Sequence, residues 1–381
     1  MAPVISVTKH THLADVHTAW AALQQSPQIA QHLFLRYEWF DAALQWQQEN
    51  TKPYFLLVLK NNLPIGICPM ATRWETRYSL TTRILEFLHV PDTQVCDIIA
   101  DTEHYAIVAN AVLAHLAADN SWDELRFTRL HLSDDKQSIF TKACKQHKLE
   151  GKWSDESPNP CVHLGKTWTE YYSARSRRLK KGNNLIANKL KKTYESIELD
   201  WVHGADIDKN KWDQALQTVV NISGKSWKRN TGLTLDQAGV NAFIRRLSKH
   251  AVENNWLSLW LLNLDGNTVA MEYQIIYRGV VHALRADYDE EYSELSPGTY
   301  MNWKLLEQLF DADLQRYEMG PGDNAYKQRW AEDHISLSRF TLYNNTLRGR
   351  VLRLLAWKIK PWIKSLARLA TKSDKDAPTG K

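Results

Sequence analysis

A helix followed by two apolar strands around a tight turn occurs twice along this chain. The first copy begins with a helix-like pattern of apolar residues at 33–46. Two β-prone runs follow at 54–59 and 65–68, and Asn61-Asn62 lies between them. Paired runs with such a break are typical of a β-hairpin, so this segment predicts a helix, a strand, a tight turn and a second strand.

The second copy lies in the other half of the chain and has the same order. A helix is predicted around 240–252, and two strands, 257–264 and 269–276, flank the turn Asp265-Gly266. Each half then continues with a further helix and a further strand: 105–117 and 125–130 in the first half, 299–314 and 316–319 in the second. Many α/β chains show such an order, but a long-period duplication explains it better than one domain of 381 residues.

The composition is that of a protein with packed cores. Hydrophobic residues make up 44% and charged residues 24% of the chain, which suits two domains of ordinary size. The cysteines are scattered, without the spacing of zinc ligands. The N-terminus lacks a charged segment followed by an apolar core, and no apolar run is long enough to cross a membrane. We therefore expect a cytoplasmic protein without a metal cofactor.

The net charge of +5 is concentrated in two segments. Residues 347–381 contain ten basic and two acidic side chains, which leaves 38 basic and 41 acidic side chains in residues 1–346. Residues 166–192 contain nine basic side chains and one acidic side chain. Two basic segments on a mildly acidic body favour localised anionic partners and argue against a DNA-binding protein.

Polar, proline-containing residues mark the boundaries between segments. The stretch 154–160 holds two prolines and predicts a linker, so we expect a first domain at 1–165, a second at 166–345 and a tail at 346–381. Within the tail, apolar residues recur every three or four positions among arginines and lysines: Leu347, Val351, Leu355, Ile359, Trp362, Leu366 and Leu369. This basic amphipathic helix, 347–369, is expected either to contact the inner membrane peripherally or to pack on the body.

The second half carries the signals of a nucleotide-binding site. The β-prone segment 280–287 leads toward the helix 299–314, and three short signals follow one another: Asp287-Tyr288, Ser296-Pro297-Gly298, and Gly320 through Lys327. A helix N-terminus beside a strand end offers unpaired N–H groups and the positive end of the helix dipole. Such a site suits the pyrophosphate of a nucleotide cofactor.

These residues resemble the CelD-like acyltransferase branch of the GNAT superfamily, which is related to the FemAB peptidyltransferases. The pattern of that branch is a tyrosine-and-aspartate strand, a Ser-Pro-Gly helix start, and a glycine shortly before Tyr-Lys and an aromatic residue. Here these elements are Asp287-Tyr288, Ser296-Pro297-Gly298, and Gly322 through Tyr326-Lys327 to Trp330. The resemblance covers residues 20–345 and is strongest over 255–330. Ser296-Pro297-Gly298 replaces the Gln/Arg-x-x-Gly-x-Gly/Ala loop of ordinary GNAT enzymes.

The resemblance implies an α/β (α+β) fold of tandem GNAT-like domains, each a mixed, mostly antiparallel sheet flanked by helices. It also implies an N-acyltransferase that moves an acyl group from acetyl-CoA or another acyl-CoA to an amine acceptor in surface-polysaccharide or cell-envelope synthesis. The first half lacks the Pro-Gly and Tyr-Lys signals and is expected to be a degenerate copy. Two alternatives stay open: a FemAB-like transferase using aminoacyl-tRNA, against which the mildly acidic body argues, and a non-catalytic assembly protein of a polysaccharide synthase.

The resemblance and the strand pattern together mark the expected site residues. For catalysis these are Asp287 as base, Glu272 as alternative base and Tyr326 as acid. For the acyl carrier they are Ser296, Pro297, Gly298, Thr299 and Lys327, whose ammonium would pair with the carrier's phosphate or with a substrate carboxylate. For the acceptor they are Trp227, Asp323 and Arg178.

Structural interpretations of the same residues also stay open. They are a turn for Asp289, a helix cap for Asp323, a core position for Tyr326 or Trp227, and a solvated helix face for Arg178. His282 stands five residues before Asp287 on the same expected strand. Because side chains alternate along a strand, these two are predicted to point to opposite faces, and His282 is expected to be structural.

Overall fold

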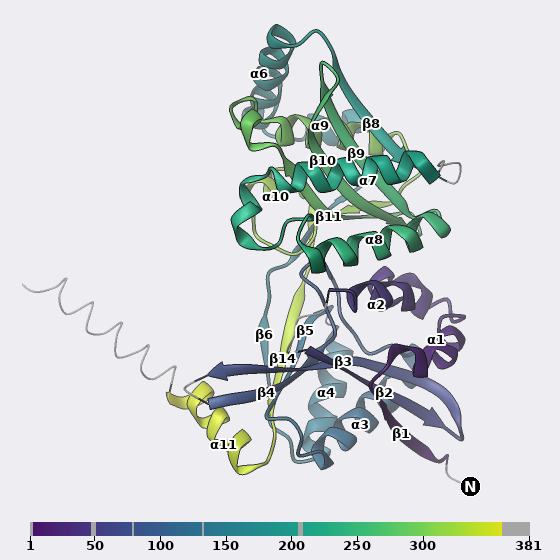
Figure 1. The fold of residues 1–381 in the computed structure, drawn as a ribbon. Helices are drawn as coiled ribbons and strands as arrows, with labels where there is room; N and C mark the ends of the chain where they lie inside the picture. Colours follow the sequence, from purple (N-terminus) through teal and green to yellow (C-terminus); the bar gives the residue numbers. More distant parts are fainter. Residues whose placement is uncertain (1–2, 47–50, 78–79, 132, 205–208, 360–381) are drawn as a thin grey trace, which may run out of the picture.

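The computed structural model describes residues 3–46, 51–77, 80–131, 133–204 and 209–359. They form two mixed sheets of seven strands each, one above the other in Figure 1. In order across the first sheet the strands are β1 (Ile5–His10), β2 (Thr51–Lys60), β3 (Leu63–Arg77), β4 (Leu80–Phe87), β5 (Glu124–His131), β14 (Leu337–Tyr343) and β6 (Gly151–Asp155). In order across the second they are β13 (Asp333–Ile335), β7 (Asn159–His163), β12 (Arg316–Glu318), β11 (Val280–Tyr288), β10 (Asn267–Tyr277), β9 (Leu257–Leu264) and β8 (Ile197–His203).

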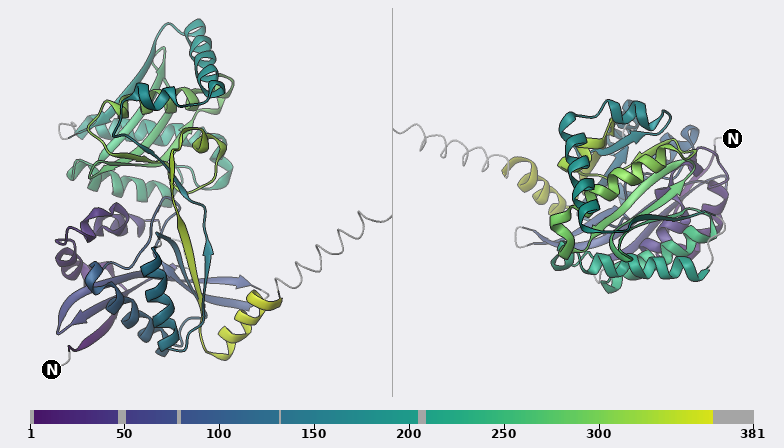
Figure 2. Two further views of the ribbon diagram at one scale, coloured as in Figure 1. Left: turned by 180° about the vertical axis from the view of Figure 1, so that it is seen from behind. Right: turned by 90° about the horizontal axis from the view of Figure 1, so that it is seen from above.

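Helices cover both sheets (Figures 1 and 2). In the first half they are α1 (His17–Leu23), α2 (Tyr37–Ala43), α3 (Thr102–Ala118) and α4 (Asp134–Gln146). In the second half they are α5 (Trp168–Ser173), α6 (Arg177–Thr193), α7 (Lys209–Gly224), α8 (Ala238–Glu253), α9 (Pro297–Phe310) and α10 (Ala325–Trp330), and α11 (Leu347–Leu354) follows. Short helical turns also lie at η3 (Leu33–Leu35), η4 (Trp227–Thr231) and η5 (Glu290–Leu295).

Both predicted hairpins are confirmed, and their turns explain why they form. Asn61 and Asn62 have φ values of 51° and 65°, and Asp265 and Gly266 have values of 45° and 78°. Two successive residues in the left-handed region give the tight turn whose twist matches that of paired strands. The helix expected at 33–46 is instead the short turn η3 followed by α2.

The two sheets follow the same plan, but each is completed by a strand of the other half. The strands β1–β5 and β8–β12 correspond in order. At the next position, β14 lies between β5 and β6 in the first sheet, and β7 lies between β12 and β13 in the second. The division expected at residue 165 therefore differs from the arrangement of strands, because β7 precedes it and β14 follows it.

One of three hydrophobic cores joins the two halves. It gathers side chains of α1 and α2 from the first half and of α7 and α8 from the second. The rings of Trp39 in α2 and Phe243 in α8 meet edge to face, with centroids 5.6 Å apart. A second core lies under α3 and α4, and a third under α6 and α9. The shared core fixes the orientation of the two sheets around the junction.

The start of the tail packs on the first half. Leu352 of α11 is buried, Arg348 forms an ion pair of 3.3 Å with the buried Asp123, and the ring of Trp357 contacts Tyr343 at 5.3 Å. Leu347 and Leu354 remain exposed. The predicted stripe residues Trp362, Leu366 and Leu369 lie outside the described residues. Within the described part of the chain, no helix is long and apolar enough to span a membrane.

Candidate functional site

Two neighbouring parallel strands of the second sheet, β11 and β12, separate partway along β11. β11 and β12 pair in parallel at only three positions, ending with His282 opposite Glu318. β11 then continues to Tyr288, whereas β12 ends at Glu318. Ala286, near the free end of β11, is exposed. β11 therefore extends past the end of β12, as the sequence predicts, and on this stretch the carbonyls of Ala283 and Ala286 accept hydrogen bonds from Gln94 and Lys228.

A bulge in β11 changes which side chains share a face of the sheet. The register with β10 shifts between the pairs Ala283–Gln274 and Arg285–Tyr273, so Leu284 is an extra residue. His282 and Asp287 stand opposite Ile275 and Met271, which are an even number of positions apart. They consequently lie on one face of the sheet, and the prediction that they point to opposite faces is wrong, because simple alternation does not allow for the bulge.

Asp287 is held by two side chains from the segment after α7. It is 6% exposed and accepts a hydrogen bond of 2.7 Å from Ser223, at the end of α7. Its other oxygen lies 2.6 Å from Nζ of Lys228 in η4, which also donates to the carbonyl of Ala286. Asp287 is thus held in place by Ser223 and Lys228 at the end of the separated strand.

The N-terminus of α9 lies beside this strand end. Ser296, with φ of 54°, is its N-cap and makes no side-chain capping bond, and Pro297 opens the first turn. A β-carbon on Gly298 would meet only Tyr288, at 3.4 Å, which is ordinary contact. Since neither backbone nor packing requires glycine here, its absence of a side chain suits the close approach of a ligand. Ser296, Gly298 and Thr299 are all partly exposed.

Glu272 lies on the opposite face of the sheet from Asp287, since its neighbour Met271 pairs with Asp287. It is 2% exposed and accepts hydrogen bonds of 2.7 Å from both Tyr317 and Gln274. Burial raises the pKa of Glu272, and these two bonds and the charge of Lys327 oppose that effect only in part. The two expected bases are therefore not brought together, and Glu272 belongs to a buried network.

Lys327 and Tyr326 occupy the loop and helix after β12. The ammonium of Lys327 is buried and donates to the carbonyls of Gly320 and Pro321, at 2.8 and 3.3 Å. Burial lowers the pKa of Lys327 to about 8. Tyr326 is about half exposed, and desolvation, followed by the carboxylates of Glu272 and Asp287, raises its pKa to about 12. Tyr326 therefore keeps its proton at neutral pH, while Lys327 holds its own loop together.

The residues expected to bind the acceptor are spread around this centre. Trp227, the neighbour of Lys228, is 57% exposed. Asp323 is exposed and accepts a bond of 2.9 Å from Gln328, and the N-cap of α10 is Asn324 instead. Arg178 lies on the exposed face of α6. Trp227 is available to a ligand near Asp287, whereas Asp323 and Arg178 have only the exposure that a surface residue has.

A loop of the first half supports the site. Asp92, after β4, forms a two-pronged ion pair with Arg285, with contacts of 2.7 and 2.9 Å. Gln94 donates to the carbonyl of Ala283 at 2.9 Å. Arg285 and Ala283 flank the bulge residue Leu284. The loop therefore holds the bulge that places Asp287 on the same face of the sheet as His282.

Sequence reasoning missed several members of the site. Ser223, Lys228, Gln274, Tyr317 and Arg285 all touch the expected residues or shape their strand. The segment Gly224–Arg229 was singled out only for Trp227, although its lysines reach Asp287 and Asp289, the latter at 3.1 Å from Lys225. Asp289 also accepts from the backbone N–H of Glu291 as the cap of η5, so its structural interpretation is supported.

One group of side chains has the geometry of metal ligands. Ligand atoms of Cys161, His163 and Asp333 lie within 4.8 Å of one another. Cys161 is buried, and His163 and Asp333 are exposed. Burial raises the pKa of the Cys161 thiol to about 11, which disfavours the thiolate that a metal requires. The group lies on β7 and β13, at the edge of the second sheet.

Comparison with known proteins agrees with this geometry. Residues 185–328 match the family model of an acetyltransferase (GNAT) domain. The matched segment includes Asp287, Gly298 and Lys327 and excludes the first half. No curated protein sequence matches the chain.

Solved structures establish the tandem arrangement. FemX is similar over 92% of this chain and 99% of its own, with 10% identity and a TM-score of 0.55. A conserved protein of unknown function from Bacteroides thetaiotaomicron is similar over 89% of this chain and 100% of its own, with 11% identity and a TM-score of 0.51. A tandem GNAT protein from the clavulanic acid biosynthesis pathway is similar over 89% of this chain and 98% of its own, with 11% identity and a TM-score of 0.50. The expected fold of tandem GNAT-like domains is thus confirmed, and the CelD-like branch stays a prediction.

Proposed function

We propose that the second half catalyses N-acyl transfer from an acyl-coenzyme A to an amine. The observation that carries this proposal is the parting of β11 and β12 beside the N-terminus of α9. The amide-rich arm of the carrier would lie along the end of β11, where β12 no longer pairs with it. The first turn of α9, open at Gly298, offers N–H groups to its pyrophosphate.

The reaction assigns a role to each positioned side chain. The amine nitrogen attacks the thioester carbonyl, an N–C bond forms, and the C–S bond breaks. A backbone N–H of β11 stabilises the oxyanion. Asp287 takes the proton that the amine loses, with Ser223 and Lys228 holding its carboxylate in place. Tyr326, which stays protonated at neutral pH, supplies a proton to the leaving thiolate.

Lys327 has a different role in this proposal from the one expected from sequence. Its ammonium already donates to two carbonyls, so a direct bond to the carrier's phosphate would require it to leave them. We assign it to shaping the loop 320–322 next to Tyr326. The acceptor, an amine of a surface-polysaccharide or cell-envelope precursor, would approach past Trp227 and Asp323.

Binding and turnover of acyl-coenzyme A test the proposal. Calorimetry with acetyl-, succinyl- and long-chain acyl-coenzyme A should give at least one saturable interaction. Release of free thiol should then depend on an added amine such as glucosamine. Absence of binding by all three thioesters would overturn the proposal and leave a non-catalytic assembly protein as the better reading.

A second candidate donor is an aminoacyl-tRNA, favoured by the exposed basic face of α6. Arg177, Arg178 and Lys181 are exposed on this helix, and Lys189 donates to the carbonyl of Glu294 in η5, just before α9. A gel-shift titration with bulk aminoacyl-tRNA, at low and high salt, separates the two donors. Submicromolar binding of tRNA with no binding of acyl-coenzyme A would establish the second candidate.

We also propose that the tail brings the protein to an anionic membrane surface. Leu347, Val351, Leu354 and Ile359 are exposed, although Leu352 of the same helix is buried. Four arginines and lysines accompany them: Arg348, Arg350, Arg353 and Lys358. Apolar residues among cations suit a helix lying in an interface. This proposal is independent of the chemistry in the second half.

A further inference from the structure

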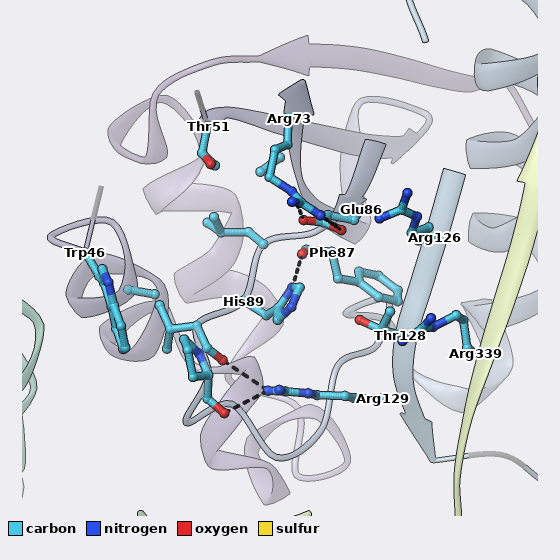
Figure 3. Close-up of a pocket in the computed structure, with 15 residues that line it drawn as sticks. Trp46, Thr51, Arg73, Glu86, Phe87, His89, Arg126, Thr128, Arg129 and Arg339 are labelled. Atoms are coloured by element: carbon cyan, nitrogen blue, oxygen red, sulfur yellow. Dashed lines mark hydrogen bonds and ion pairs between the residues drawn. The ribbon is translucent and has the colours of Figure 1, made fainter. Parts of the chain in front are cut away.

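The first half holds a pocket where its own central strands part. β4 and β5 pair in parallel only as far as Glu86 and Arg126, and the pocket opens beyond that pair. Its volume is about 390 Å³, within the usual range for small-molecule sites. Figure 3 shows side chains converging on it from β3, β4, β5, the end of α2 and β14. The pocket occupies the place in the first sheet that the proposed carrier cleft occupies in the second.

Among the arginines of this pocket, Arg129 differs from its neighbours in its partners. Arg73 is paired with Glu86 at 3.0 Å, and Arg339 with Glu156. The guanidinium of Arg129 instead donates to three carbonyls, of Val90, Pro91 and Thr93. Among the described residues, its Nε and Nη2 have no hydrogen-bond partner. Carbonyl dipoles leave its positive charge largely uncompensated, so the pocket can accept one negative charge.

The backbone of Arg129 supports a functional reason for this placement. Its φ is 56°, in the left-handed region that an arginine rarely adopts. The backbone N–H of Arg129 donates to Glu156, which also holds Arg339. A conformation of this kind persists only where the surroundings enforce it, and such sites are concentrated at ligand-binding positions.

His89 adds a neutral acceptor to the pocket. Its Nδ1 lies 2.8 Å from the carbonyl of Phe87, and because a carbonyl can only accept, Nδ1 carries the proton. Burial, followed by the charge of Arg129, lowers the pKa of His89, which keeps the ring neutral. Nε2 is therefore free to accept a hydrogen bond from a ligand hydroxyl.

Thr128 and Trp46 complete the lining. Thr128 is 6% exposed, and its hydroxyl oxygen has no hydrogen-bond partner, which is costly for a buried polar group. In Figure 3 it lies between Arg129 and Phe87 at the inner end of the pocket. Trp46 forms an aromatic wall on the other side and packs against Phe243 of the second half.

We propose that this pocket binds a small hydroxylated carboxylate, such as a uronic-acid sugar. Arg129, whose guanidinium has only carbonyl partners among the described residues, receives the carboxylate. His89, Glu86 and Thr128 receive the hydroxyl groups, and Trp46 covers the apolar side of the ligand. The proposal does not depend on acyl transfer, because it concerns a site in the other half of the chain.

Calorimetry on the full chain with glucuronate, glucose and glucose 1-phosphate tests this proposal without any acyl donor. Glucuronate should bind about tenfold or more tightly than glucose, because only the former carries the charge. Arg129→Gln should weaken glucuronate binding by roughly ten- to hundredfold and leave glucose binding little changed. Lys304→Gln in α9 is the matched control, because it also removes one positive charge but Lys304 does not line the pocket. This variant should bind glucuronate as the unmodified protein does.

A second variant keeps the test decisive if Arg129→Gln fails to fold. Thr128→Val keeps the shape, removes the unpartnered hydroxyl, and should leave the melting temperature equal or higher while weakening glucuronate binding severalfold. No binding of glucuronate at about 20 mM, or equal binding of glucose, would overturn the proposal. Tighter binding of glucose 1-phosphate would overturn the assignment to a carboxylate.

Discussion

The first half parts its parallel strands after Glu86 and Arg126, and the second half parts its own after His282 and Glu318. On the strand β5, Glu124 and Arg126 form an ion pair of 2.7 Å two residues apart. At the corresponding positions of β12 the order of charges is reversed, with Arg316 paired to Glu318. In both halves an ion pair thus lies where the two parallel strands separate. The last paired residue is the basic Arg126 in β5 and the acidic Glu318 in β12.

The side chains beneath the two parting points differ more strongly. In the second half, Gln274 stands opposite the residue after His282, and Glu272 lies two positions further along β10. In the first half, Met70 of β3 stands opposite Phe87, the residue after Glu86, and Cys68 lies two positions further along β3. The second half therefore has a buried polar network where the first has an apolar core, which favours chemistry in one half and binding in the other.

The loops that follow the two strands also serve different purposes. After β11, η5 leads directly to α9 and leaves Gly298 open. After β4, Asp92 and Gln94 reach across to β11 and occupy the junction between the halves. In the second half, the helix start beside the separated strand end therefore carries the glycine that a carrier pyrophosphate could approach.

The largest expected effect is that of Gly298→Val. A branched side chain at this position would fill the space in which the pyrophosphate is expected, and carrier binding should be abolished. Its β-carbon meets only Tyr288 at ordinary distance, so the fold should persist. Thr102→Val at the start of α3 is the matched change in the first half and should leave affinity unchanged. Equal affinity in folded Gly298→Val, measured by calorimetry, would contradict the placement.

Asp287→Asn should lower the rate of acyl transfer by roughly 10²- to 10⁴-fold, because the amide cannot take the proton of the amine. Asp289→Asn is the control, since that carboxylate caps η5 and pairs with Lys225. Initial rates of thiol release at saturating carrier measure both variants. A nearly unchanged rate in Asp287→Asn would contradict the role of Asp287 as the base.

Glu318→Gln should destabilise the protein at the parting point itself. Burial alone would raise the pKa of Glu318, but His282 and Arg316 outweigh it and lower the pKa from 4.5 to about 2. A lowered folded-state pKa adds stability above pH 4.5, which is lost as the pH falls toward 2. Urea unfolding should show a loss of about 3 kcal/mol at pH 7 that shrinks by about 1 kcal/mol at pH 3.5.

Glu307→Gln is the control for that measurement, because Glu307 forms only a surface pair with Lys304. It should cost less than about 1 kcal/mol at either pH. A loss in Glu318→Gln that does not change with pH would mean that packing, and not charge, holds the parting point.

The smallest effect is expected from shortening the tail. Removal after Asn345 loses the buried Leu352 and the pair of Arg348 with Asp123, so the melting temperature should fall by about 5 °C. Removal after Ile359 keeps these contacts and should leave the melting temperature unchanged. Co-sedimentation with anionic vesicles should be lost in the shorter protein, and vesicle binding that survives removal after Asn345 would contradict the membrane proposal.

The regular features of the fold could be predicted from the sequence, because they depend on local chemistry. The asparagines at 61 and 62 and the pair Asp265-Gly266 specify tight turns, and apolar strands on both sides specify the hairpins. The exchange of β7 and β14 could not be predicted in the same way. The periodicity of a strand's sequence does not indicate which distant strand it pairs with. The sequences of β7 and β14 are therefore compatible with either sheet.

The candidate site was predictable to the extent that its residues follow one another in the chain. Asp287 and Gly298 lie at the strand end and helix start where the sequence places them. The bulge at Leu284 was not visible, since one extra residue in an apolar strand has no signature of its own, and it reversed the predicted face of His282. Lys228 and Ser223 were missed because only the fold brings η4 and α7 to β11.

The crossing of β7 and β14 also sets the order in which the molecule can be completed during its synthesis. Because β14 stands between β5 and β6, the first sheet cannot close until the chain has emerged from the ribosome as far as Tyr343. Arg339 finds its partner Glu156 at a separation of 183 residues, so the first half must wait for almost the whole of the second. β7, by contrast, is synthesised before its sheet partner β12 and stays unpaired with it until residues 316–318 have been made. A nascent chain of this protein therefore carries two unfinished sheets, and β14, the last of the strands that the structure describes, completes the sheet that β1 begins.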